Sequence, residues 1–482
     1  MDCGCTLQNF SEDGGYLVCT DAVCKKHVEG CKYAINTIEK GHYIYKSGIP
    51  IAETIRCIAP GEWINSDNTK PLRYENKTIE LDAVTRIKID HENDSFMGYK
   101  NPHGGVATRK KILIIGTVCC VNQTIRRLNK FLVKKLNNLG DLEILPLTHL
   151  SGCGHVAGGI DVETLGRLID GHIRNPNCFG AVVIGLGCED IQYNSVYTSS
   201  DKIIHLSNRQ SFESEKEEFN KIYKVVRDKV SEVVAIQRTS FDIENLVIGL
   251  QCGGSDGLSG VTANPLLGSL TDVVCENGGS AILSETPELS GCREWCIKRT
   301  ATDARSKFSE IFSYWDSECS DHESNPAPGN LQGGILNVFE KSLGAVLKGG
   351  RGKISDVISY GDPIRHSGLT FMDSPGYDPC SITGQVSAGA NVIIFTTGRG
   401  SNYDNGLVPV IKMSSNKATY ESGNEYIDFD ASDYMNIPKR ENLLSNLMAI
   451  VLKTCSGELR TKSEILGVED VVFVPWQRGT TV

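Results

Sequence analysis

The 482-residue sequence predicts an α/β protein in which a small β-rich N-terminal domain precedes a large region of mainly parallel sheets in two subdomains. Three observations predict this class. Short β-branched runs separated by turn signals fill residues 1–75, as in small β domains. From residue 111 onward, buried apolar strands alternate with helical patterns, which is typical of parallel α/β sheets. The chain is also too long for one ordinary core.

The N-terminal domain is expected over residues 1–75. Its strand-like runs are GGYLVCT, HYIYKSG and IPIAETIRCI, and the turn signals PGEW and NSDNTKP interrupt them. The cysteines of this segment, Cys3, Cys5, Cys19 and Cys24 among them, do not have the spacing of a standard zinc ribbon. A polar linker is expected to follow at 76–108.

Two α/β domains are expected after the linker, at 109–240 and 241–482. The first combines the strands KILIIGTV, LEILPLT and FGAVVIGLG with a helix ended by Gly140 and a long charged helix that begins at FESEKEE. That charge run indicates a solvated helical face. The second contains the strands ENLVIGL, GGSAILSE, LTFMDSPG and NVIIFTTGRG.

Composition excludes several classes of function. A net charge of −10 and a pI near 5.6 argue against a broad nucleic-acid surface, because phosphates require clustered Lys and Arg. No apolar run reaches the roughly 18 to 20 residues that span a bilayer. The first residues have no basic and apolar leader, so we expect a cytoplasmic protein. Any anionic substrate would have to be met by local basic residues, and whether the chain forms a homo-oligomer stays open.

Four cysteines follow buried strands in the α/β region: Cys120, Cys153, Cys188 and Cys252. The carboxyl ends of parallel strands share one edge of a sheet, so these thiols would converge if their strands are neighbours. Convergent thiolates bind iron, zinc or an iron–sulfur cluster. The alternative is that each cysteine is a small buried residue of the core.

Glycine-rich loops form a second set of candidates. NPAPGN, LKGGRGK, DSPGYDP and TTGRGS expose backbone N–H groups, and Arg351 and Arg399 add guanidinium groups that can hold a carboxylate at two points. None of these loops is a Walker or dinucleotide-binding loop. Each of them alone could equally be a tight turn.

Eight motifs follow one another along the chain from about residue 95 to the C-terminus. They are VCCVNQT, THLSGCGH, RNPNCFGAVVIGLGCE, GLQCGGSDGLSGVTANPLLG, GGSAILSETPEL, NPAPGNLQGGILNVFEKSLGAVLKGG, FMDSPGYDPCSITGQVSAGANVIIFTTGRGS and VFVPW. With these motifs in this order, the chain resembles the altronate and galactarate dehydratase family, which also contains the sulfolactate sulfo-lyases. The N-terminal unit is more weakly similar to the small β-rich SAF domain.

The resemblance implies an iron-dependent hydro-lyase. Such an enzyme would remove water across C2 and C3 of a sugar acid such as altronate or galactarate and yield a 2-keto-3-deoxy acid. Iron, as Fe²⁺ or an iron–sulfur cluster, would be held by Cys120, Cys153, Cys188 and Cys252. Candidates for acid–base or orienting roles are His149, Asp256 and Glu189, and candidates for binding the substrate are Arg109, Lys348, Arg399, Lys412, Asn264, Asn330 and Ser255.

His149 lies in the same turn as Cys153, which favours a role as base or acid. A histidine bonded to a neighbouring carbonyl is the equal alternative. The chain also departs from the family: WINSDN places Trp63, Asn65 and Asp67 where histidines are usual, and GYKNPHGGVATRKK keeps only Arg109 of the usual basic residues. A changed substrate explains this most simply. Two other functions remain open, a sulfo-lyase that releases sulfite from an acid such as sulfolactate and a non-catalytic sugar-acid-binding protein.

Overall fold

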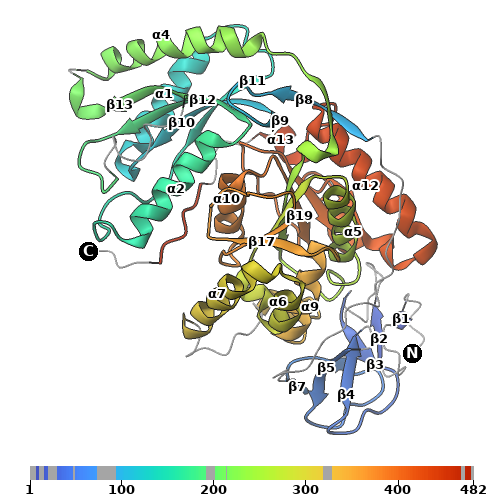
Figure 1. Ribbon diagram of the computed structural model, residues 1–482. Helices are drawn as coiled ribbons and strands as arrows, with labels where there is room; N and C mark the ends of the chain where they lie inside the picture. The colour runs from blue at the N-terminus through green and yellow to red at the C-terminus, as the bar shows by residue number, and fades with distance from the viewer. Residues whose placement is uncertain are drawn as a thin grey trace.

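The computed structural model describes residues 7–9, 16–19, 30–46, 49–72, 94–191, 201–212, 214–318, 328–467 and 473–478. Figure 1 shows a small β unit at one end, the α/β unit of the seven-stranded sheet in the middle, and the α/β unit of the parallel four-stranded sheet at the other end. This arrangement confirms the predicted fold class. The side chains of Cys3, Cys5, Cys19 and Cys24 lie outside the described part of the chain.

The N-terminal unit consists of two small antiparallel sheets, with the strand orders β1-β2-β3-β6 and β4-β5-β7. Its interior is apolar because alternate residues of the strands point inward, and Ile44, Ile51, Ile58 and Ile64 are fully or almost fully buried. The strands are β1 Leu7–Asn9, β2 Tyr16–Cys19, β3 Lys32–Ala34, β4 Tyr43–Lys46, β5 Ile49–Thr54, β6 Trp63–Ile64 and β7 Thr69–Pro71.

Part of the expected linker is folded. β8 (Ser95–Lys100) pairs antiparallel with β9 (Val106–Ala107) and with β14 (Thr239–Asp242). Phe96 and Tyr99 of β8 are buried, and the guanidinium of Arg238 lies 4.2 Å from the centre of the Tyr99 ring. The polar composition of residues 76–108 led to the prediction of a linker, although Phe96 and Tyr99 are buried in a strand.

The first α/β unit contains a parallel four-stranded sheet of order β11-β10-β12-β13. Every residue of β10 is buried, as expected for a strand covered on both faces. Its strands are β10 Lys110–Gly116, β11 Leu142–Leu147, β12 Cys178–Gly185 and β13 Ile203–Asn208, and its helices are α1 Asn122–Lys135, α2 Ile160–Arg174 and α4 Glu215–Val234. Helix α1 ends at Lys135, five residues before Gly140, where the sequence predicted its end.

The second α/β unit contains a parallel seven-stranded sheet of order β17-β18-β16-β15-β19-β20-β21. Its strands are β15 Val247–Gly253, β16 Ser280–Leu283, β17 Ile354–Ile358, β18 Gly368–Met372, β19 Val392–Thr397, β20 Val410–Ser414 and β21 Phe429–Asp430. Its helices are α5 Ala263–Glu276, α6 Arg293–Arg299, α7 Arg305–Glu318, α8 Pro328–Gln332, α9 Val338–Val346, α10 Asp378–Ala388, α11 Lys417–Ser422, α12 Arg440–Cys455 and α13 Lys462–Leu466. No described helix is long and apolar enough to cross a membrane.

A C-terminal strap, residues 473–478, connects the two α/β units. The Trp476 ring stacks on Trp315 of the second unit, with 5.2 Å between the ring centres. The next residue, Gln477, donates a hydrogen bond to Ser151 Oγ of the first unit at 3.0 Å, and the backbone N–H of Arg478 donates to Asp161. In Figure 1 this red segment runs beside α2. The strap therefore ties together the carboxyl edges of the two sheets.

Candidate active site

Three cysteine-bearing turns meet at the carboxyl edge of the four-stranded sheet. The backbone N–H of Cys119 donates to the Ser151 carbonyl at 2.9 Å, and that of Asp190 donates to the Gly152 carbonyl at 3.0 Å. These bonds join the turns after β10, β11 and β12. Cys120, Cys153 and Cys188 are exposed on them. We call these residues the thiol rim.

Cys252 lies elsewhere. It belongs to β15 of the seven-stranded sheet and is buried, with its sulfur 2.9 Å from Ser255 Oγ and 3.8 Å from Asn264 Nδ2. Burial raises the pKa of its thiol. The structure thus brings the turns of three predicted thiols together and places the fourth in a different cluster.

The donor set of the thiol rim fits a soft metal in its chemistry, because its three members are thiols on adjoining turns. Within the described residues, no three His, Cys, Asp or Glu side chains are already gathered as metal ligands. A metal at this rim would have to draw the three exposed side chains together. Iron stays a proposal for these residues.

His149 is a structural histidine. It is 3% exposed, its Nε2 donates to the Gly116 carbonyl at 2.8 Å, and its Nδ1 accepts the Ser151 N–H at 3.1 Å. Both ring nitrogens are therefore used by the backbone, which fixes the neutral form. Burial lowers its pKa in addition. Of the two interpretations of His149, the structure favours the histidine bonded to a neighbouring carbonyl.

A second histidine of the same turn has the partners that His149 lacks. His155 Nδ1 lies 2.9 Å from Asp190 Oδ2, and its Nε2 lies 3.3 Å from Ser151 Oγ. The carboxylate holds the ring in a fixed orientation. Sequence analysis missed His155 and Asp190, although each lies two residues beyond a rim cysteine.

Glu189 and Asp256 hold loops. Glu189 accepts hydrogen bonds from Thr117 Oγ1 at 2.8 Å and from the Gly187 N–H at 2.6 Å, so it fastens the turns after β10 and β12. Asp256 is 4% exposed and accepts hydrogen bonds at both carboxylate oxygens. Its donors are the N–H and hydroxyl of Ser259, the hydroxyl of Ser415 and the amide of Asn416. Both residues thus orient the backbone.

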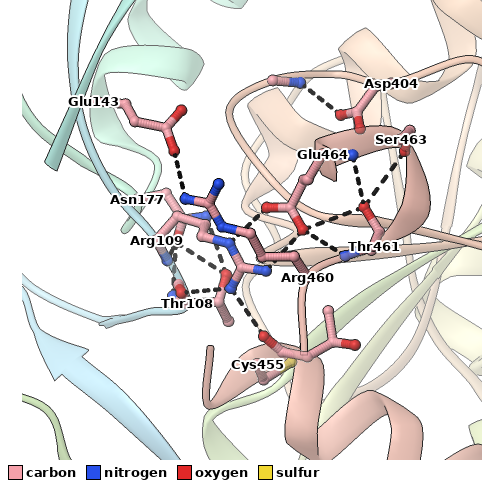
Figure 2. Close-up of polar contacts among 12 residues, drawn as sticks. Thr108, Arg109, Glu143, Asn177, Asp404, Cys455, Arg460, Thr461, Ser463 and Glu464 are labelled. Carbon is pink, nitrogen blue, oxygen red and sulfur yellow. Dashed lines mark hydrogen bonds and ion pairs between the residues drawn. The ribbon is translucent and has the colours of Figure 1, made fainter. Parts of the chain in front are cut away.

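Two predicted substrate-binding cations are structural. Arg109 forms a two-point ion pair with Glu464 of α13, at 2.7 and 2.9 Å, and donates to the Thr454 carbonyl (Figure 2). Lys412 is fully buried and donates to the Tyr403 carbonyl and to Ser463 Oγ. Arg109 and Lys412 therefore fasten the C-terminal helices to the α/β units, and neither is available to a substrate carboxylate.

Replacing Arg109 by Met tests this assignment. The change leaves Glu464 largely buried without its guanidinium, so we expect a loss of about 3 kcal/mol in the free energy of unfolding. Denaturant midpoints measure it, and Arg460→Met, at an exposed pair with Glu143, is the control expected to stay within about 0.5 kcal/mol. If Arg109 bound the substrate, Arg109→Met would instead raise KM and leave the denaturant midpoint unchanged.

Two of the four glycine-rich loops have partners within the protein. In LKGGRGK, the N–H groups of Arg351 and Gly352 both donate to Asp272 Oδ1, so the anion held by this loop is a side chain of the protein. In TTGRGS, the N–H of Gly400 donates to Thr397 Oγ1, and Arg399 is exposed. Of the predicted cations, Arg399 alone is both exposed and next to the Cys252 loop, where its side chain approaches Gly254.

A buried charged cluster lies at the carboxyl edge of the seven-stranded sheet. Gln251 Nε2 donates to Glu285 Oε1 and to Asp378 Oδ1, each at 2.7 Å. The Lys348 ammonium forms an ion pair with Glu285, and both side chains are completely buried. The predicted residue Lys348 therefore belongs to this cluster, whereas Gln251, Glu285 and Asp378 escaped sequence analysis.

Further polar groups extend the cluster toward the surface. Lys341 of α9 forms an ion pair with Glu288 at 2.6 Å. The Asn330 amide can accept from Lys341 Nζ and donate to the Ser255 carbonyl, both at 3.1 Å. The predicted residues Ser255, Asn264 and Asn330 thus lie beside Cys252, and Asn264 Oδ1 also accepts a hydrogen bond from Thr396. We call these residues the lysine–carboxylate cluster: Gln251, Cys252, Ser255, Asn264, Glu285, Glu288, Asn330, Lys341, Lys348 and Asp378.

The lysine–carboxylate cluster has the electrostatics of a reactive site. Burial raises the pKa of Asp378 to about 6, and Gln251 holds the carboxylate. Glu285 adopts a left-handed backbone conformation, with φ of 68°, which is costly for a residue with a side chain. Within the described residues, Glu288 Oε2 and Gln251 Oε1 are buried and lack a hydrogen-bond partner. These two unpaired acceptors can each receive a hydrogen bond from a polar ligand.

Two family models match the chain. The model for the second domain of D-galactarate dehydratase/altronate hydrolase matches residues 98–235, and the C-terminal model of D-galactarate/altronate dehydratase matches residues 243–481. These ranges cover the two α/β units and both clusters of the candidate site. The chain therefore contains the two α/β domains that these family models describe.

Curated relatives agree with the models. The chain is 31% identical over 448 residues to altronate dehydratase of Bacillus subtilis, which covers 89% of this chain and 88% of the relative. It is 30% identical to galactarate dehydratase (L-threo-forming) of Escherichia coli over 92% and 89% of the two chains. Identity to the (2R)-sulfolactate sulfo-lyase subunit beta of Chromohalobacter salexigens is 27%, over 79% and 97%. The chain belongs to the D-galactarate/altronate dehydratase family.

Proposed function

We propose that the protein is a hydro-lyase that dehydrates a sugar acid such as altronate or galactarate to a 2-keto-3-deoxy acid. The family of the chain supports the reaction class. The observation that carries the proposal is the lysine–carboxylate cluster, where a carboxyl group with a pKa of about 6 lies among ammonium groups. Removal of a proton next to a carboxylate requires a base and fixed positive charge at the same place.

Asp378 is the base in this proposal. At neutral pH a carboxyl group with a pKa of about 6 is mostly ionised, and it is more basic than an ordinary aspartate. It would take the proton from C2. The ammonium of Lys348 is completely buried, so it would stabilise through space, without contact, the negative charge that then develops on the substrate carboxylate. Burial alone would lower the pKa of Lys348, but Glu285, Cys252 and Glu288 together outweigh burial and raise it, so the ammonium stays charged.

Lys341 and Asn330 are suited to bind the substrate. The Lys341 side chain is 19% exposed, and its ammonium can reach an acid that approaches from solvent. Burial would lower the pKa of Lys341, but Glu288, Cys252 and Glu285 together outweigh burial and raise it, so this group is also charged. The unsatisfied Glu288 Oε2 can accept a hydrogen bond from a substrate hydroxyl. Together these groups recognise a carboxylate and a neighbouring hydroxyl.

Iron is the cofactor that we propose, held by Cys120, Cys153 and Cys188 of the thiol rim. When bound, it would supply a Lewis acid for a hydroxyl oxygen. The strap connects the rim to the second unit, because Gln477 contacts Ser151 of the rim and the Arg478 guanidinium lies 3.9 Å from Asp373. Asp373 precedes the loop that leads to Asp378. His155, held by Asp190, orients the rim turn that carries Cys153.

A product assay tests the proposal. Protein purified without oxygen and supplied with Fe²⁺ is incubated with altronate, galactarate and sulfolactate, and 2-keto acid and sulfite are both quantified. Formation of a 2-keto-3-deoxy acid from a sugar acid is the expected result. Sulfite release from sulfolactate alone would replace the hydro-lyase by the sulfo-lyase activity, and ligand-induced thermal stabilisation without turnover would indicate a binding protein.

A further inference from the structure

Two lysines of the N-terminal domain are buried against the second α/β unit. Lys32 Nζ and Lys46 Nζ both contact Glu340 Oε1 of α9, at 2.7 and 2.6 Å, and the Glu340 side chain is completely buried. The other carboxylate oxygen of Glu340 accepts the Leu336 N–H at 2.9 Å. Burial alone would raise the pKa of Glu340, but Lys32 and Lys46 outweigh burial and lower it to about 2. The three groups thus form a buried ion-pair contact between domains.

The same lysines also hold backbone of the candidate active site. Lys46 Nζ donates to the Gly257 carbonyl at 3.1 Å, in the loop that follows Cys252. Lys32 Nζ donates to the Gly334 carbonyl at 2.8 Å, in the loop between α8 and α9. The two loops are joined directly, because the Gly257 N–H donates to the Gly333 carbonyl at 2.8 Å. Each lysine therefore links Glu340 to one of the loops.

Close backbone contacts show why these loops need glycine. A Cβ atom at Gly257 would lie 2.1 Å from the Gly30 carbonyl oxygen, and one at Gly334 would lie 2.3 Å from the same atom. The structure uses Gly257 and Gly334 to admit the N-terminal domain.

The contact is next to the residues that would bind substrate. Glu340 and Lys341 are consecutive in α9, so the residue that anchors the lysines is covalently joined to the cation of the candidate site. Ser255 lies two residues before Gly257, and Asn330 lies in α8, four residues before Gly334. A displacement of either loop would move Ser255 or Asn330 relative to Lys341.

We propose that the N-terminal domain positions the substrate-binding loops of the candidate active site through Lys32 and Lys46, which act as positioning residues. The catalytic consequence of this inference rests on the proposed function. Its structural part, the ordering of residues 254–261 and 328–336 by the two lysines, does not. The N-terminal domain thus contributes to the candidate site by holding these two loops. The residues that do so, Lys32 and Lys46, are distinct from Trp63, Asn65 and Asp67, which stand where histidines are usual in the family.

Hydrogen exchange measured by mass spectrometry tests the structural part on the full-length protein. Lys46→Met is compared with the wild type and with Lys70→Met, a matched control at an exposed ion pair with Glu53 in the same domain. We expect amides of residues 254–261 and 328–336 to exchange faster on the order of tenfold in Lys46→Met, with β15 and β19 unchanged. Lys46→Gln, which retains an N–H donor, serves if the Met variant does not fold.

Steady-state kinetics on the acid that the wild type dehydrates test the catalytic part. We expect KM of Lys46→Met to rise on the order of tenfold with kcat changed less than about twofold, because the displaced groups bind the substrate less well. Unchanged exchange in the two loops, or equal changes in Lys70→Met, would overturn the inference. A wild type without turnover would contradict the proposed function instead, and the exchange data would then decide on positioning alone.

Discussion

Replacement of Asp378 by Asn is expected to lower kcat by about 10²- to 10⁴-fold, because the variant lacks the proposed base but keeps the shape of the side chain. The amide can still lie against Gln251, so the fold should be retained. Turnover of the sugar acid and a thermal unfolding curve are measured on the same preparation. Asp433→Asn, at an exposed ion pair with Lys439, is the matched control and should retain wild-type kcat.

The pH profile distinguishes a base from a merely structural aspartate. The carboxylate is the active form, and burial raises the pKa of Asp378 to about 6. The kcat/KM of the wild type should therefore rise with pH up to about 6 and level off above it. The residual activity of Asp378→Asn should lack this rise. An Asn variant with wild-type kcat, or with the same rise, would remove Asp378 from the mechanism.

Replacement of Lys348 by Met is expected to lower the free energy of unfolding by about 3–5 kcal/mol, because it leaves the Glu285 carboxylate buried without its cation. Both side chains are completely buried, so water cannot compensate for the lost charge. Glu285 also has an unfavourable backbone conformation that this contact helps to maintain. Denaturant midpoints for wild type and variant give the difference.

A double variant separates charge from packing in this measurement. Glu285→Gln combined with Lys348→Met removes both charges, and we expect it to be more stable than Lys348→Met alone. Lys439→Met provides the exposed control, with an expected change within about 0.5 kcal/mol. A Lys348→Met variant as stable as the control would show that the pair is not a buried ion pair in solution.

Periodicity predicted the fold where a strand is buried on both faces. β10, β12, β15 and β19 are continuous apolar runs, and the structure contains all four. β17 was missed because the consecutive polar residues Ser355 and Asp356 interrupt its apolar residues. β21 escaped because it has two residues, too few for a period.

The candidate site was predictable only in part. The rule that parallel strands end at one edge brought together the turns of Cys120, Cys153 and Cys188, but it could not place Cys252, because the chain builds two sheets. The separation of 355 residues between Arg109 and Glu464 hid the ion pair that removes Arg109 from the site. His149 and His155 lie in one turn, and only backbone geometry decides which of them is held by a carboxylate.

The central claim is that this chain removes a proton from C2 of a sugar acid and expels the C3 hydroxyl. Proton NMR of the reaction in D₂O, with anaerobically purified, Fe²⁺-supplied protein, tests it most directly. We predict a 2-keto-3-deoxy acid with one deuterium at C3, because the enol left by elimination takes its new hydrogen from solvent. Altronate and galactarate that both remain intact under these conditions would contradict the account.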